Sequence, residues 1–355
     1  MNLKLILLHI ILLSGILLIS GCGNGGPSGP IVKPQSMGKI YQVNVLSTDA
    51  LINSPTMDTL DFQYGQAYPI LPQPEPYFEL RPYVAEDLDA QPVLRQLKCF
   101  LILADLSKNN PLVDMVKKDF KGTLEEKASG VKVGRDKWAQ DQLLIYIYGP
   151  NESALQKEIK KSFPSVAREV EKFYQGMIRS TVFVQGINNS ITEKINAKFG
   201  VDLPIPADYV TALETDSMIW LRQEIPDISR SILITKKPYK NPEEFSRQGF
   251  KEMRDRLGRY VSSTIEGTFM QINDEDLPLY INQVEIDDKY ALRARGIWEI
   301  VGDFMGGSFV SYAILDEESQ EVVLLDGFVY SPQKPKKLSM IYLDYILRQV
   351  QLAGN

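Results

Sequence analysis

Histidine is almost absent from this sequence of 355 residues, which contains a single copy, His9. His9 lies in an N-terminal segment that we expect to be cleaved, so the mature chain would contain no histidine. This excludes catalysis by Ser-His-Asp or Cys-His groups, histidine-ligated zinc or haem, and proton transfer by imidazole. We predict no catalytic residue, no cofactor and no metal site.

Cysteine is nearly as scarce, with Cys22 and Cys99 as the two copies. Cys22 is predicted to carry a lipid, which leaves Cys99 without an intramolecular partner and excludes a disulfide framework. Cys99 lies in the apolar run "LKCFLILAD" (97–105), whose length is typical of a central strand. We interpret Cys99 as a buried small hydrophobic residue rather than a reactive thiol.

Charge is scarce at the N-terminus, where Lys4 is the one charged side chain before Cys22. The apolar run at 5–19 has the length of a secretory signal and is shorter than the roughly 20 residues that span a bilayer. The segment "ISGC" (19–22) resembles the bacterial lipobox, whose cysteine is linked to diacylglycerol and becomes the first mature residue. We predict a signal peptide at 1–21 and a lipid anchor on Cys22; the alternative is a plain signal peptide with an incidental cysteine.

The following segment, residues 22–38, is rich in glycine, proline and serine and contains one charged side chain, Lys33. This composition predicts a flexible tether with a root-mean-square reach of about 20 Å. Gly23 stands where lipoproteins retained at the inner membrane often have Asp, and the acidic run typical of surface-exported lipoproteins is missing. We therefore expect an outer-membrane lipoprotein that faces the periplasm.

The chain is moderately acidic, with 39 Lys and Arg against 45 Asp and Glu and a net charge of −6. Basic pairs such as Lys117-Lys118 are dispersed among acidic residues, unlike the footprint of a nucleic-acid-binding protein. We expect the membrane as a partner, through the lipid on Cys22, together with an envelope protein or a small ligand. We expect no nucleic acid as a partner.

Strands predicted in neighbouring runs, with few strand–helix–strand alternations, favour an α+β fold with mainly antiparallel sheets and amphipathic helices. We divide the folded chain into an N-terminal half (39–200) and a C-terminal half (201–355). Each half contains a strand, a polar turn and an Asn-capped helix, which is compatible with two similar halves from a duplication. Strands are predicted at 40–47, 97–105, 142–148, 209–213, 217–222, 231–235, 280–286, 291–299, 308–315 and 321–330.

Capping residues indicate where helices begin and end. Ser54 and Gly65 bracket a helix with proline in its first position. Asn151 begins a helix that we expect Pro164 to interrupt. A further helix is predicted to begin at Ser190, with Glu193 in a capping box, and to end at Gly200. Another is predicted to begin at Asn241. The last helix is predicted near the C-terminus, where one apolar face is formed by Leu343, Ile346, Leu347 and Val350.

A proline-rich segment lies between the first two long strands, with prolines at 69, 72, 74, 76 and 82. This spacing excludes a helix and predicts extended chain that crosses the surface. Its aromatic residues Tyr68, Tyr77, Phe78 and Tyr83 are suited to stack on a sugar or to receive a partner protein. Packing over a sheet edge is the alternative.

Two further segments contain residues that could form a phosphate-binding, catalytic or calcium site. In "DFMGGSFVSY" (303–312) the paired glycines precede a strand rather than a helix, which favours a bulge or a close backbone approach over a phosphate loop. Ser308 there lacks nucleophile-elbow spacing and a histidine to activate it. The acidic segment 273–288 has the oxygen ligands that calcium prefers but lacks the EF-hand pattern, so we interpret it as a solvated loop.

Tryptophan stands close to arginine at two places in the C-terminal half. Arginine over an indole face is a plausible binding arrangement. The alternative is that tryptophan packs in the sheet core while the arginine head groups reach solvent. The candidate binding surface comprises Trp220, Arg222, Arg293, Arg295, Trp298, Gly306 and Gly307.

The sequence "RGIWEIVGDFMGGSFVSYAILDEESQEVVLLDGFVYSP" (295–332), with "LPQPEPYF" (71–78) and "SMIWLRQEIPDISRSILI" (217–234), resembles a Bacteroidetes lipoprotein family known as a domain of unknown function. The resemblance covers nearly all of the mature chain and implies an envelope setting. It implies no activity, cofactor or catalytic residue. The family has proline where this chain has Ser308, which further disfavours a serine nucleophile.

We therefore expect a lipid-anchored envelope protein that acts as a non-enzymatic binding or scaffold module in the periplasm. The alternative is a carboxylate-dependent hydrolase acting on glycan, which a cleft with two carboxylates about 5–10 Å apart would favour. A third hypothesis, a structural spacer, predicts no concave pocket.

Overall fold

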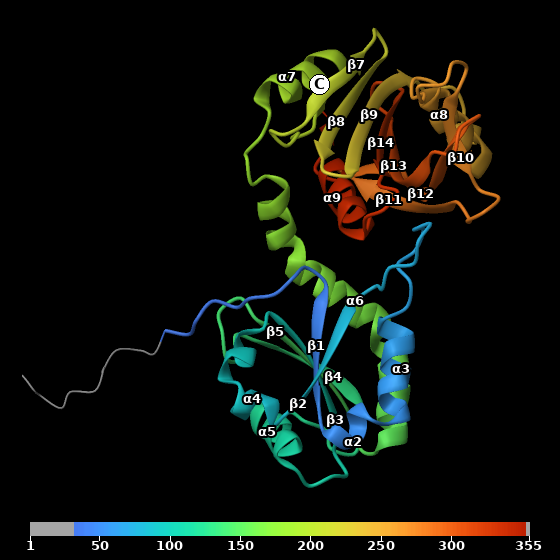
Figure 1. Ribbon diagram of the computed structural model, residues 1–355. Coiled ribbons are helices and arrows are strands. Elements are labelled where there is room, and N and C mark those ends of the chain that lie inside the picture. The colour runs from blue at the N-terminus through green and yellow to red at the C-terminus, as the bar shows by residue number, and fades with distance from the viewer. Residues whose placement is uncertain (1–31, 353–355) are drawn as a thin grey trace, which may run out of the picture.

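The computed structural model describes residues 32–352. The predicted signal peptide (1–21), the predicted lipid anchor Cys22 and most of the predicted tether lie outside these residues. Figure 1 shows two bodies, each built around a β-sheet and joined by the long helix α6 (Glu152–Val182). The expected α+β fold is confirmed. Within residues 32–352, no helix is both long and apolar enough to cross a membrane.

The first body contains a five-stranded sheet of order β2-β1-β3-β5-β4. Its β1 pairs in parallel with β2 and β3, and β3 pairs in parallel with β5, while β4 runs antiparallel to β5. Every residue of β3 and β5 is buried, as expected for a sheet with helices on both faces. The strands are β1 (Gln42–Ser47), β2 (Glu79–Val84), β3 (Cys99–Asp105), β4 (Gly130–Arg135) and β5 (Leu143–Gly149).

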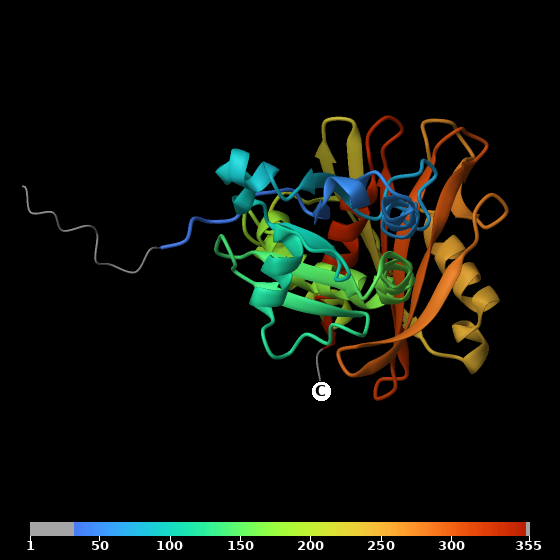
Figure 2. The ribbon, with the colours of Figure 1, turned by 90° about the horizontal axis from the view of Figure 1, so that it is seen from below.

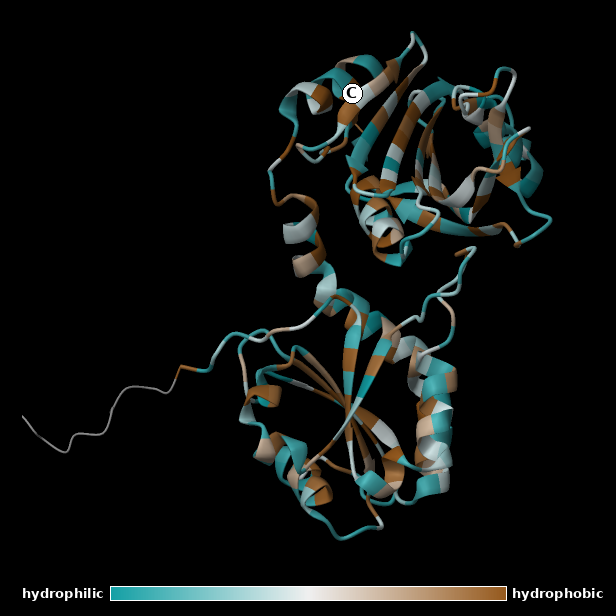
Figure 3. Ribbon diagram, in the orientation of Figure 1, coloured by the Kyte–Doolittle hydropathy of each residue, from teal (hydrophilic) through white to brown (hydrophobic). Residues whose placement is uncertain are grey.

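Helices cover both faces of this sheet, and Figure 3 shows hydrophobic residues concentrated on its strands. Leu60 of α3 and Leu155 of α6 belong to the core on one face. Leu88 of α4 and Val116 of α5 belong to the core on the other. The helices before α6 are α2 (Asp49–Ile52), α3 (Pro55–Tyr64), α4 (Asp87–Ala90), the 3-10 helix η1 (Pro92–Gln96) and α5 (Pro111–Asp119).

The second body contains an eight-stranded antiparallel sheet of order β10-β12-β13-β14-β9-β8-β7, with β11 also paired to β12. The strands are β7 (Val210–Glu214), β8 (Met218–Ile225), β9 (Ile228–Pro238), β10 (Phe269–Asn273), β11 (Tyr280–Ile286), β12 (Lys289–Val301), β13 (Gly306–Asp316) and β14 (Glu321–Tyr330). A separate pair joins β6 (Val201–Asp202) to β15 (Gln351–Leu352). The predicted hairpin at 308–330 is formed by β13 and β14.

Helices lie on both faces of the large sheet, as Figure 2 shows. On one face α8 (Arg247–Gly258) packs through Phe250 and Leu257, after the 3-10 helix η2 (Pro242–Phe245). On the other face lie α7 (Asn189–Phe199) and α9 (Lys337–Leu347). Because α9 also places Ile341 and Tyr345 in the core of the first body, it packs between the two bodies.

The two bodies differ in topology. The smaller sheet has five strands and mostly parallel pairing, whereas the larger has eight strands and antiparallel pairing. The two strand–turn–helix segments therefore lie in different surroundings, and the sheets do not repeat one another. Helix α7 precedes the predicted boundary at 200 but packs in the core of the second sheet.

Several predicted helix boundaries are confirmed. Ser54 accepts a hydrogen bond from the Thr56 amide at the start of α3, and Asn151 accepts one from the Ala154 amide at the start of α6. Gly200 ends α7 in the left-handed conformation, with φ of 63°. The two side chains pair with free backbone N–H groups at the helix starts, and the glycine allows the left-handed turn that ends a helix, as expected for capping residues.

Two boundaries are corrected. Pro164 does not interrupt the helix that begins after Asn151, because α6 continues for 31 residues with this proline on its exposed side. The burial of one continuous apolar face from Leu155 to Ile178 outweighs the local cost of the proline. The cap of α7 is Asn188, which accepts from the Ile191 amide at 3.2 Å, and not Ser190.

The proline-rich segment is extended, as predicted, and forms a narrow arm that reaches from the first body to the second (Figure 1). We call residues 66–77 the proline arm. Its two sides pair through the Tyr68 amide and the Glu75 carbonyl at 2.7 Å. At its tip the Ile70 carbonyl accepts a hydrogen bond from Ser308 Oγ at 2.8 Å. The arm is thus a further connection between the bodies, in addition to α6.

Candidate functional site

The predicted binding surface is divided between the two faces of the large sheet. Successive residues of β12 alternate between faces. Trp298 contributes to the core on the α8 face, whereas Arg293 and Arg295 line a cavity on the α9 face. The structure therefore does not bring these arginines together with Trp298.

On the α8 face the two tryptophans contact one phenylalanine. The rings of Trp220 and Trp298 lie 6.4 and 5.5 Å from the ring of Phe328, measured between centroids. Trp298 is 2% exposed, and the Arg222 guanidinium lies 5.5 Å from the Trp220 ring centroid. This arrangement is a packed core with an arginine at its rim.

The paired glycines lie in β13 opposite Trp298 and Glu299. A Cβ added to Gly307 would lie 2.0 Å from the Val329 carbonyl oxygen and 3.0 Å from Trp298 Nε1. The expected close backbone approach is confirmed. The groups that approach Gly307 are β14 and the Trp298 indole of this protein. Ser308, which follows, is fully buried and donates to the proline arm, so it is not placed as a nucleophile.

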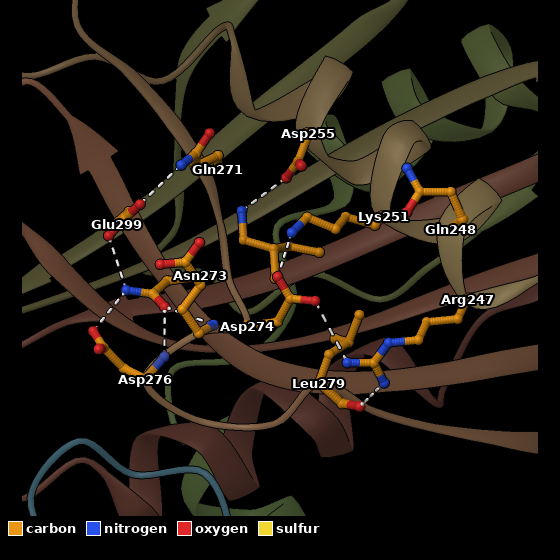
Figure 4. Close-up of polar contacts among 12 residues, drawn as sticks. Arg247, Gln248, Lys251, Asp255, Gln271, Asn273, Asp274, Asp276, Leu279 and Glu299 are labelled. Atoms are coloured by element: carbon orange, nitrogen blue, oxygen red, sulfur yellow. Dashed lines mark hydrogen bonds and ion pairs between the residues drawn. The ribbon is translucent and has the colours of Figure 1, made fainter.

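The acidic segment packs against α8, as Figure 4 shows. Asp274 forms ion pairs with Lys251 and Arg247, and Arg247 also donates to the Leu279 carbonyl at 2.6 Å. These contacts attach the segment to the helix. Among residues 32–352, no three carboxylate, histidine or cysteine side chains gather as they would around a metal ion.

Asn273 and Asp255 complete this network (Figure 4). The Asn273 amide group donates to Asp276 at 2.8 Å and to Glu299 at 2.9 Å. Asp255 accepts from the Ile272 amide at 2.7 Å, and burial raises the pKa of its carboxyl. Because these polar groups are paired with one another, the cluster is built to hold β10 and its loop on α8.

Cys99 is buried in the centre of the small sheet, as predicted. Burial raises the pKa of its thiol to about 12, so the thiolate is not formed at neutral pH.

A cavity between the two bodies has the features of a binding site. Its volume is about 360 Å³, within the range of pockets that hold small molecules. The first body, the proline arm, β12 and α9 all contribute to its wall. The lining residues are Tyr41, Tyr68, Pro69, Tyr77, Glu171, Gln175, Ile178, Arg293, Arg295, Ile341, Asp344, Tyr345 and Arg348.

One wall of the cavity is a closed ion-pair network around Asp344. Arg293 donates to Asp344 Oδ1 through Nε at 3.0 Å and Nη2 at 2.8 Å. Tyr312 donates to the same oxygen at 2.7 Å, and Arg348 Nε lies 3.5 Å from Oδ2. Although burial lowers the pKa of Arg293, Asp344 outweighs it and the net shift is upward. The Asp344 carboxylate is therefore held by two cations and a phenol.

The cavity lining also includes tyrosines that stay neutral. Tyr77 donates to Glu171 on α6. The pKa of Tyr68 is raised to about 12, chiefly by burial and by the nearby Asp344, while Arg293 and Arg295 act to lower it. Burial also raises the phenol pKa values of Tyr41 and Tyr77. At neutral pH these phenols are hydrogen-bond donors rather than charged groups.

Arg295 differs from the other cavity arginines. Within residues 32–352 its side chain has no ion pair, and its Nε is buried without a hydrogen-bond partner. It lines the main cavity and also a small apolar crevice beside it, formed with Ile70, Leu71, Val310 and Met340. The residue is half-buried, and a buried N–H such as this Nε is seldom left without a partner, because unmatched buried donors are costly.

The sequence identified Arg293, Arg295 and the tyrosines of the proline arm but missed the rest of this site. Tyr41 directly precedes β1, whereas Glu171 and Asp344 lie on α6 and α9, and no local pattern connects these three residues. The tyrosines of the proline arm were considered for binding, but their arginine partners could not be named. Alternation along β12 could have separated Arg293 and Arg295 from Trp298.

Two family models match the chain. Residues 188–349 match a family described as a domain of unknown function, DUF4837, and residues 36–175 match a second one, DUF8532. The expected resemblance is confirmed to this extent, with two uncharacterised domains rather than one. The lipoprotein character stays a prediction. None of the curated proteins matches the chain.

Solved structures show weak similarity. A point mutant of Mog1 aligns at 9% identity over 44% of this chain and 92% of its own, with a TM-score of 0.29. The Ran-binding protein Mog1p of Saccharomyces cerevisiae aligns at 9% identity over 44% and 91%, with a TM-score of 0.28. LpqN of Mycobacterium tuberculosis, described as involved in cell envelope biogenesis, aligns at 10% identity over 42% and 82%, with a TM-score of 0.26. These similarities carry no argument about function.

Proposed function

We propose that this protein is a lipid-anchored envelope protein that binds a small ligand in the cavity between its two bodies. The observation that carries the proposal is the cavity of about 360 Å³ lined by both bodies and by the proline arm. A ligand there would contact α6, β12 and α9 at once. Ligand sites commonly lie at such interfaces between packed units.

The contacts of the two cavity carboxylates, Asp344 and Glu171, favour ligand binding over catalysis. Asp344 accepts hydrogen bonds from Arg293 and Tyr312 and forms an ion pair with Arg348, so its oxygens are already engaged within the protein. Glu171 accepts from Tyr77. A glycan hydrolase needs one carboxylic acid that donates a proton, and Asp344 is poorly placed for that task.

The proposed setting is the periplasmic face of the outer membrane, with Cys22 as the lipid attachment point. It is supported by the apolar run at 5–19, the small residues before Cys22 and the polar tether after it. In this setting the cavity would sample small molecules of the envelope.

The test is thermal unfolding of the full-length protein with and without the dialysable small molecules of an envelope extract. A bound ligand at about 100 times its Kd stabilises the folded state by about 2.7 kcal/mol. Gln175→Trp fills the cavity from α6, whereas Lys172→Trp changes an exposed residue of the same helix. We expect stabilisation of the wild type and of Lys172→Trp but not of Gln175→Trp. Equal stabilisation of all three would contradict the proposal.

A further inference from the structure

We propose that the ligand of this cavity carries an anionic group, a carboxylate or a phosphate, that binds the guanidinium of Arg295. This inference rests on the proposed function, since it names the chemistry of the ligand for the same cavity. It depends on three features of the wall: an open cation, neutral phenols beside it, and an apolar crevice behind it.

The first feature is the difference between Arg295 and its neighbours. Arg293 and Arg348 both contact Asp344, so each already has an anionic partner within the protein. Arg295 has no ion pair within the described residues, and its Nε is buried without a partner. A planar guanidinium with free N–H groups matches the paired oxygens of a carboxylate or phosphate.

The second feature is the balance of charge on the wall. The arginines Arg293, Arg295 and Arg348 face two carboxylates, Glu171 and Asp344, which leaves one positive charge in excess. A single anionic group would balance it. The excess positive charge argues against a cationic ligand, which would have to approach Arg295.

The third feature is the set of contacts open to the rest of the ligand. Tyr68 lines both the main cavity and the small crevice, as Arg295 does. Its phenol can donate to a second ligand oxygen, and its ring offers an apolar face. The crevice beside it, lined by Leu71 and Val310, has a volume of about 10 Å³, which leaves room for one small group of the ligand at most.

The test is affinity selection on the full-length protein, using a library of small carboxylic acids and phosphate monoesters mixed with their neutral amides and alcohols. Bound compounds are identified by mass spectrometry. Arg295→Gln removes the positive charge, whereas Arg295→Lys keeps the charge but lacks the planar guanidinium with its paired N–H donors. Arg168→Gln is the matched control, because Arg168 is an exposed arginine of α6 outside the cavity.

We expect acids or phosphates to be retained by the wild type and by Arg168→Gln, at least tenfold less by Arg295→Gln, and at an intermediate level by Arg295→Lys. The retained class distinguishes a carboxylate ligand from a phosphate ligand. The wild type could instead retain neutral compounds, with retention lost in Gln175→Trp and unchanged in Arg295→Gln. That result would overturn the proposal of an anionic ligand but would still support ligand binding in the cavity. Retention of no compound would overturn the proposed function itself. Thermal unfolding of each variant shows that it is folded.

Discussion

In the part of the chain that the structure describes, charged side chains inside this protein occur in two settings, an ion pair in the core and an unpaired arginine in a cavity. Arg254 and Asp326 are both fully buried and paired at 2.9 Å, and the Arg254 guanidinium lies 3.7 Å from the Phe309 ring centroid. Ser311 also donates to Asp326. This pair lies within the core, where Arg254 Nη1 and Asp326 Oδ2 have no further partner among the described residues, whereas Arg295 lines a cavity. The first is suited to stability and the second to binding.

The pair in the core leads to a prediction about stability. Asp326→Ala leaves the Arg254 charge buried without its partner, so we expect a loss of about 3–5 kcal/mol in the free energy of unfolding. The control is Asp89→Ala, which breaks an exposed pair with Arg95 and should cost less than about 1 kcal/mol. Urea unfolding measures both. Similar losses in the two variants would show that burial does not set the strength of the pair.

At the scale of elements, the large sheet depends on close contact between β13 and β14. Gly307→Ala places a methyl group 2.0 Å from the Val329 carbonyl oxygen, so strands must move apart. We expect a loss of about 1–3 kcal/mol or more in the free energy of unfolding. Gly176→Ala on α6 meets nothing within 4 Å and should be neutral or stabilising by up to about 1 kcal/mol. A tolerated Gly307→Ala in urea unfolding would contradict the close approach.

The proline arm and α9 form a second element-scale connection. Glu75 accepts hydrogen bonds from the Lys337 amide, at 3.2 Å, and from the Lys336 amide at the start of α9. Glu75→Ala removes this cap, so we expect faster amide hydrogen exchange in the first turn of α9 and in residues 66–77, with a loss of about 0.5–2 kcal/mol. Glu86→Ala, an exposed residue beside α4, is the control. Unchanged exchange would contradict a role of Glu75 in holding the arm against α9.

Local patterns predicted most elements, because capping side chains and alternation act over a few residues. Ser54, Asn151 and Gly200 illustrate this, and the strands of the large sheet lie close to their predicted positions. Pairing direction in the small sheet was harder, since the intervening helices α3 and α5 had to be recognised as crossovers between parallel strands. Pro164 shows the opposite error, in which a strong local signal was overridden by packing.

The cavity was predicted only in part because it is a property of the whole molecule. Arg293 and Arg295 stand beside Trp298 in the sequence, yet the period of two along β12 places them on the other face. Their actual neighbours, among them Glu171 and Asp344, are brought close by the docking of two separate sheets. No spacing in the sequence carries that information.

At the scale of the whole molecule, two bodies of different topology are held together by α6, α9 and the proline arm, and they enclose a polar cavity between them. The arrangement couples ligand binding to the contact between the bodies, because one ligand would touch both. The predicted lipid on Cys22 would confine this binding to a membrane surface.

The most direct test of this account is native mass spectrometry of the protein purified from its own membranes, comparing the wild type with Gln175→Trp. We predict a mature chain that begins at an acylated Cys22 and, on the wild type, an additional small anionic adduct that Gln175→Trp lacks. The same adduct on both proteins, or no adduct on either after exposure to envelope small molecules, would contradict a ligand cavity between the bodies. An unmodified Cys22 would contradict the membrane setting.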